Sequence, residues 1–124
     1  MEHCIRERKL LAEEFKKCQK TIIAIGDETR QRIILTLLEH EAGGMRVGEI
    51  TERTHLSRPA VSHHLQILKE ARIVGMRRKG TMNFYYMNAK DTEWSSLAGL
   101  LNHISEVIQY VADTGCPDCD ADVE

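Results

Sequence analysis

Apolar residues recur at alternating steps of three and four near both ends of the 124-residue chain. This spacing places them along one face of a helix, so it predicts amphipathic helices over about 5–24 and 91–114. The first stripe consists of Leu11, Phe15, Cys18, Ile22 and Ile25, and the second of Trp94, Leu97, Leu101, Ile104, Ile108 and Val111. A domain this small can hardly cover both stripes by itself, so we expect a homodimer formed through these two helices.

The segment between these helices predicts a helix-turn-helix. Asp27 is a favourable N-cap for the first of three short helices. The apolar face of that helix comprises Ile33, Ile34, Leu37 and Leu38. The sequence VGEITERT predicts the second helix, and Ser57 caps the third, with Pro59 in its first turn, where proline is tolerated. Only the residues HLS separate these last two helices, and such a tight turn is typical of helix-turn-helix motifs.

The pattern after this motif is typical of strands. The sequence IVGMRRKGTMNFYYMN is rich in β-branched and aromatic residues on both sides of a Lys-Gly-Thr turn, which predicts a β-hairpin, the wing. The predicted fold is mainly α with a small β-hairpin, a single winged-helix domain over 1–124. It divides into a dimerisation helix at 1–25, a winged helix-turn-helix at 26–90, a second dimerisation helix at 91–114 and an acidic, cysteine-containing tail at 115–124.

Charge is distributed unevenly along the chain. The formal net charge is −2, but Ser57–Lys90 carries +6, which leaves −8 for the remainder. A basic middle segment is typical of a surface that faces a polyanion. The chain lacks an apolar run of about 18 residues, and its first residues are charged throughout. We therefore expect a soluble, cytoplasmic protein with neither a signal peptide nor a membrane partner.

The adjacent His63 and His64 fall on different sides of the predicted third short helix. We expect His64 beside the core, hydrogen-bonded to the backbone, and His63 on the outside, so the two form neither a metal pair nor a catalytic pair, and we expect no enzyme activity. The outward surface carries groups that suit base edges and phosphates in a major groove: Arg58, Ser62, His63 and Gln66. The cations of the wing, expected to bind phosphates or to enter a minor groove, are Arg77, Arg78 and Lys79.

Three segments together resemble the ArsR/SmtB family of winged-helix repressors: GDETRQRIILTLL, VGEITERTHLSRPAVSHHLQILKEARIV and RRKGTMNFYYMN. The resemblance covers roughly residues 22–88, about half of the chain. It implies a homodimeric repressor that binds an imperfect inverted repeat in operator DNA and leaves it when an effector reaches a cysteine or histidine site. It also implies that Ser57, Arg58, Ser62 and His63 touch the operator.

Two sensor sites known in that family are incomplete in this sequence. The first needs a Cys-Val-Cys type box where this chain reads RVGE, so both thiols are missing. The second joins residues at the two ends of the last helix. His103 and Glu106 match its later half, but Lys90 and Thr92 occupy the ligand positions of its earlier half. His103 and Glu106 also point away from the apolar stripe, so we expect a solvated face, and they are the weakest metal candidates.

The four cysteines are the remaining candidates for a sensor. Cys116 and Cys119 form a Cys-x-x-Cys pair that can share one soft ion or close a disulfide. Cys4 would lie near them if the first helix ran antiparallel to the last, with His3 as a further ligand, whereas Cys18 is more typical of a small buried side chain. We therefore favour a repressor released by thiolate-bound As(III), Cd(II), Pb(II) or Zn(II).

Two alternatives stay open. The first is a redox or reactive-sulfur sensor in which Cys116 and Cys119 are oxidised. The second is a constitutive winged-helix module that binds DNA or protein and whose cysteines are inert.

Overall fold

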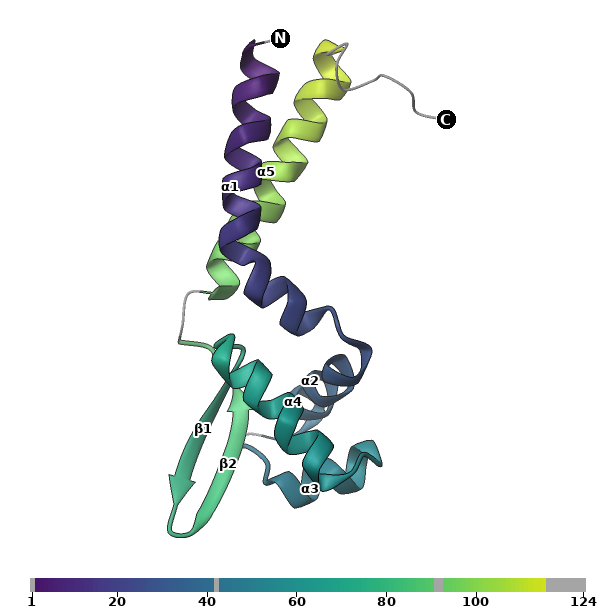
Figure 1. The fold of residues 1–124 in the computed structure, drawn as a ribbon, viewed down its shortest axis with the longest axis vertical. Helices are drawn as coiled ribbons and strands as arrows, with labels where there is room; N and C mark the ends of the chain where they lie inside the picture. Colours follow the sequence, from purple (N-terminus) through teal and green to yellow (C-terminus); the bar gives the residue numbers. More distant parts are fainter. Residues whose placement is uncertain (1, 42, 91–92, 116–124) are drawn as a thin grey trace. The chain divides into compact units, whose positions relative to one another are not determined.

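Figure 1 shows the computed structural model of the protein, which describes residues 2–41, 43–90 and 93–115. The elements in chain order are α1 (Glu2–Ile25), α2 (Glu28–Glu39), α3 (Val47–Thr54), α4 (Arg58–Glu70), β1 (Val74–Lys79), β2 (Met82–Met87) and α5 (Glu93–Thr114). This order confirms the predicted fold class, mainly α with a small β-hairpin. Within the described ranges, no helix is both long and apolar enough to cross a membrane.

The chain falls into two compact units. The helical unit contains α1 as far as Gln19 together with α5 from Trp94, and the winged unit contains residues 20–93. The winged unit therefore takes the last turns of α1 in addition to the predicted helix-turn-helix and hairpin.

The core of the winged unit is shared by α2, α3, α4 and the hairpin. Asp27 and Ser57 cap α2 and α4 as predicted, each accepting a hydrogen bond from the backbone N–H three residues later, at 2.9 and 3.2 Å. The apolar face of α2 is narrower than predicted, because Ile33 and Leu37 are buried but Leu38 is 60% exposed. The most deeply buried side chains of this unit include Ile33, Met45, Ile50, Val61, Leu65, Leu68, Ile73 and Val74.

The wing consists of β1 and β2, which pair antiparallel along their whole length. Gly80 makes the turn between them with φ of +65°, a conformation that glycine adopts without strain. A backbone contact that the sequence does not reveal joins the wing to the segment before α3, because Met45 and Tyr85 exchange two hydrogen bonds of 2.8 Å. Gly44 permits this approach, since a Cβ there would lie 2.9 Å from the Tyr85 carbonyl oxygen.

The helical unit consists of two antiparallel helices, as Figure 1 shows. His3 in the first turn of α1 packs on Tyr110 near the end of α5, with ring centroids 4.3 Å apart. The apolar stripe predicted on α5 is divided between two faces. Leu97 is buried, but Leu101 and Ile108 are 56% and 64% exposed. Leu100, one position before Leu101, is buried inside the unit instead.

Candidate nucleic-acid interface and ligand pocket

The α4 helix separates buried from exposed residues with the helical period. Its inner face, formed by Val61, Leu65 and Leu68, is buried in the core of the winged unit. The structure leaves every polar side chain that the sequence singled out here exposed: Ser57, Arg58, Ser62, His63 and Gln66. Gln66 is partly engaged within the helix, since its amide donates to the Glu70 carboxylate at 3.1 Å. Contact of these residues with DNA remains a prediction.

A groove of about 450 Å³ lies where the start of α3, the start of α4 and the wing turn meet. Arg58 contributes to it, and so does Arg46, a cation that the sequence analysis did not single out. The sequence could have indicated Arg46 as a candidate for phosphate binding, because it directly precedes the first helix of the helix-turn-helix and helix starts of this motif lie close to phosphates. The other polar lining residues are Glu49, Glu52, Thr81 and Asn83.

The wing cations are exposed at the end of β1. Arg77 donates to the Gly43 carbonyl at 2.7 Å, and Arg78 donates to the Gly80 carbonyl at 3.1 Å. The Arg77 bond reaches the segment before α3, whereas the Arg78 bond stays within the wing, and each guanidinium group has further N–H donors. Lys79 is exposed beside them.

His64 is half-buried beside the core, but its predicted backbone partner is wrong. Its Nδ1 lies 3.3 Å from a guanidinium nitrogen of Arg30, a buried side chain of α2. Burial lowers the pKa of His64 below its ordinary value. The Asp27 carboxylate opposes this effect, and Arg30 and His63 add smaller lowering effects. The neutral form of His64 is therefore favoured.

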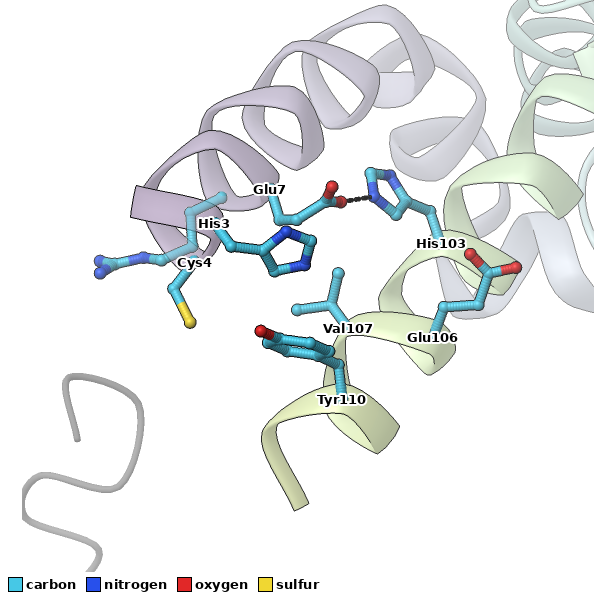
Figure 2. Close-up of a pocket in the computed structure, with 8 residues that line it drawn as sticks. His3, Cys4, Glu7, His103, Glu106, Val107 and Tyr110 are labelled. Carbon is cyan, nitrogen blue, oxygen red and sulfur yellow. Dashed lines mark hydrogen bonds and ion pairs between the residues drawn. The ribbon is translucent and has the colours of Figure 1, made fainter. Parts of the chain in front are cut away.

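The helical unit contains a pocket of about 240 Å³ between the start of α1 and the second half of α5 (Figure 2). The expectation of a solvated face is wrong for His103, because its side chain is only 18% exposed and its two ring nitrogens contact Glu7 and Glu14 of α1. The helical wheel of α5 alone could not predict these contacts of His103, because both carboxylates belong to α1. The pocket is lined by His3, Cys4, Glu7, Arg8, His103, Glu106, Val107 and Tyr110.

The two carboxylates favour the imidazolium form of His103. An ionised carboxylate only accepts hydrogen bonds, so a ring that bonds to one at each nitrogen must carry both protons. Glu7 and then Glu14 raise the pKa of His103 above its ordinary value. In the same way, the hydrogen bond from His103 lowers the pKa of Glu7.

The candidate metal ligands are only partly described. Cys4 and Cys18 are buried in α1, and Cys4 lines the pocket next to His3. Among the residues that the structure describes, no three histidine, cysteine or acidic side chains are grouped so that they could hold a metal ion. Cys116 and Cys119 lie outside the described residues.

Comparison with known proteins identifies the family. The family model described as "Bacterial regulatory protein, arsR family" matches residues 27–75. The transcriptional repressor SdpR of Bacillus subtilis is 37% identical over 83 residues, which cover 67% of this chain and 88% of that protein. The chain belongs to the ArsR family.

Two further relatives agree with this assignment. An uncharacterised helix-turn-helix transcriptional regulator of Methanocaldococcus jannaschii is 43% identical over 60% of this chain and 82% of its own length. A solved structure described as "Possible transcriptional regulator for arsenical resistance" is 26% identical with a TM-score of 0.56, and the match covers 75% of this chain and 94% of that one. This ArsR-family chain is thus a DNA-binding transcriptional regulator and not an enzyme.

The His103 contacts predict a pH-dependent stability of the ArsR-family chain. Because the folded-state pKa of His103 is raised, its stabilising effect is full below the ordinary value of 6.5 and is lost as pH rises through the raised pKa. The lowered pKa of Glu7 makes the same pair weaken as pH falls below the ordinary 4.5. The midpoint of thermal unfolding, followed by circular dichroism, should therefore exceed that of His103→Gln most between these two pH values, and the difference should shrink at alkaline pH.

His63→Gln is the matched control, because His63 is exposed and should leave the pH profile of stability unchanged. If the unfolding midpoints of wild type and His103→Gln change in parallel from acid to alkaline pH, the ion pairs of His103 with Glu7 and Glu14 do not stabilise the packing of α1 on α5.

Proposed function

We propose that the chain is a homodimeric transcriptional repressor that binds an imperfect inverted repeat in operator DNA and is released by an effector at cysteine thiols. The observation that carries the proposal is the arrangement of α4, whose buried face is fixed in the core while Arg58, Ser62 and His63 remain exposed on its other side. The related SdpR, which is named a transcriptional repressor, supports repression.

The exposed side of α4 suits a major groove. An α-helix fits this groove, and its N-terminal residues approach the base edges. In this chain those residues include a guanidinium group at Arg58, which can form two hydrogen bonds to a guanine, and hydrogen-bonding groups at Ser62 and His63. Arg77, Arg78 and Lys79 at the wing supply contacts to phosphates that fix the register of α4 without reading sequence.

Exposed apolar side chains on the helical unit support the homodimer. Leu101 and Ile108 lie on the uncovered face of α5, and Phe15 and Leu10 are exposed on α1. Water contact with such side chains is unfavourable, and a second copy of the same two helices offers a self-complementary cover. Two copies would also present two recognition helices, as an inverted repeat requires.

A soft metal or metalloid ion is the favoured effector. Cys116 and Cys119 supply two thiolates at a spacing that suits As(III), Cd(II), Pb(II) or Zn(II). The described donors next to the pocket, Cys4 and His3, suit such ions but are too few for a site, so the fit depends on the Cys-x-x-Cys pair. Cys18 is buried in α1, which suits packing better than binding. A solved relative described as a possible regulator of arsenical resistance supports this class of effector.

An oxidative signal is the second candidate, favoured by the same Cys-x-x-Cys spacing. An oxidant that accepts two electrons and two protons would leave Cys116 and Cys119 joined by a disulfide.

Substitutions on α4 and on the wing should have different effects on DNA binding. Arg58→Ala or His63→Ala should weaken binding to the duplex that wild type selects from a random library by about 1–3 kcal/mol and change the base preference. Arg77→Ala or Arg78→Ala should weaken binding to all duplexes alike and reduce the salt slope by about one unit for each phosphate that the variant no longer binds. Fluorescence anisotropy at several salt concentrations measures both effects.

Lys16→Ala is the control for these variants, since Lys16 is an exposed cation of the helical unit. Binding that is no weaker in the four variants than in Lys16→Ala would place the DNA interface elsewhere.

Replacing both tail cysteines should abolish release from DNA. Thiolates must lose their protons to bind an ion, so release by As(III), Cd(II) or Zn(II) should weaken as pH falls. A 100-fold release needs a coupling free energy of about 2.7 kcal/mol between ion and DNA. The measurement is dissociation from the selected duplex by wild type, Cys116→Ser with Cys119→Ser, and Cys4→Ser, each with these ions or a mild oxidant.

A loss of response in Cys4→Ser as well as in the double variant supports a site shared with α1. A loss in the double variant alone supports a local Cys-x-x-Cys site. If the double variant dissociates as readily as wild type under every effector, the tail is not the sensor and the inert-cysteine alternative holds.

A further inference from the structure

We infer that Arg30 and His64 are positioning residues for DNA binding, which together fix the recognition helix α4 to the C-terminal end of α1. The inference rests on the proposed DNA interface, because it concerns where that interface is held. All the groups involved lie within the winged unit.

Arg30 occupies an unusual place for a cation. It lies in the first turn of α2, where the helix dipole disfavours positive charge, and it is only 9% exposed. Apart from a favourable interaction with the carboxylate of the N-cap Asp27, its own helix therefore gains little from a guanidinium group at this position. The contacts that account for it are with two other helices.

The first contact is with the end of α1. Nε of Arg30 donates to the Ala24 carbonyl at 2.7 Å, and Nη2 donates to the Ile23 carbonyl at 3.1 Å. Carbonyls in the last turn of a helix lack partners within the helix and carry the negative end of its dipole. A guanidinium group donates hydrogen bonds to these carbonyls and places a positive charge at the negative end of the dipole. Arg30 therefore joins α2 to the end of α1.

The second contact is with α4. Nη1 of Arg30 lies 3.3 Å from Nδ1 of His64. A guanidinium group can only donate, so Nδ1 must accept, and the proton of the neutral ring is on Nε2. The charged groups acting on His64 are Arg30 and Asp27 from α2 and His63 from its own helix.

The position of His64 makes this contact relevant to DNA recognition. It follows Ser62 and His63 directly, so any rotation or shift of α4 at His64 moves these exposed side chains with it. Protonation of His64 would remove the acceptor and place a second positive charge against Arg30. The hydrogen bond should therefore break as pH falls through the lowered pKa of His64.

The test compares variants of His64 that keep or remove the acceptor. In His64→Asn the side-chain carbonyl can accept from Arg30 but does not titrate, whereas His64→Leu removes the acceptor. His64→Leu should bind the selected duplex about tenfold more weakly than wild type at pH 7.5, as expected for the loss of a hydrogen bond to a charged group, with an unchanged salt slope. His64→Asn should bind within about twofold of wild type.

The pH profile separates positioning from a general loss of stability. As pH falls from 7.5 through the lowered pKa of His64, wild type should lose affinity relative to His64→Asn, although added positive charge on its own would strengthen binding to DNA. His63 is present in both proteins, so its titration cancels in the comparison. This readout remains decisive even if His64→Leu fails to fold.

Two further variants complete the design. Arg30→Lys keeps the charge but cannot reach all three acceptors, and it should weaken binding as His64→Leu does. Gln31→Ala is the matched control, because Gln31 donates to the neighbouring Ile25 carbonyl at 2.8 Å but lies outside the contact with His64. It should bind as wild type does.

The inference is overturned if wild type and His64→Asn have the same pH profile, or if Arg30→Lys binds as Gln31→Ala does. Arg58→Ala, measured in parallel, separates this failure from that of the proposed interface. If Arg58→Ala weakens binding while the Arg30 and His64 variants do not, only the positioning role is wrong. If Arg58→Ala also binds normally, the interface itself is wrong.

Discussion

The α4 helix, which we propose as the recognition helix, must be held by one face while its opposite face stays exposed, and the rest of the winged unit depends on this constraint. The helical period allows both, since Val61, Leu65 and Leu68 are buried while Ser62 and His63 are exposed between them. Burial of each large apolar side chain contributes roughly 1.5–3 kcal/mol, which is as much as a good contact to a base. Rotation of α4 about its axis would therefore cost more than any single contact with DNA could recover.

Hydrogen bonds join α4 and the wing to the neighbouring elements. Met45 and Tyr85 join the wing to the segment before α3, and Arg30 joins α4 to the end of α1. Because α1 also carries Cys4 and the carboxylates that contact His103, one helix contributes both to the pocket of the helical unit and to the hydrogen bonds of Arg30 in the winged unit. In the proposed function, an effector would need to change the relative free energies of two arrangements by only a few kcal/mol to release DNA, a change comparable to one or two such contacts.

The sequence predicted the elements well because each has a local signal, such as the N-caps Asp27 and Ser57, the turn at Gly80 and the apolar periods. It failed where the partner is distant in sequence. The partner of His64 is Arg30, at a sequence separation of 34 residues. The two carboxylates that contact His103 lie 89 and 96 residues from it in the sequence. The helical wheel also could not decide which of Leu100 and Leu101 is buried, since both are apolar and adjacent. The sensor prediction at Cys116 and Cys119 lies outside the described residues.

We propose above all that two copies of this chain bind one operator together. Native mass spectrometry of the wild-type protein with the duplex that it selects measures this directly, because it counts the 14.2 kDa chains on each DNA molecule. We expect two chains per duplex, on half-sites whose centres are about 10 base pairs apart or a multiple of that spacing. One chain per duplex at saturation, on a sequence without two-fold symmetry, would contradict it.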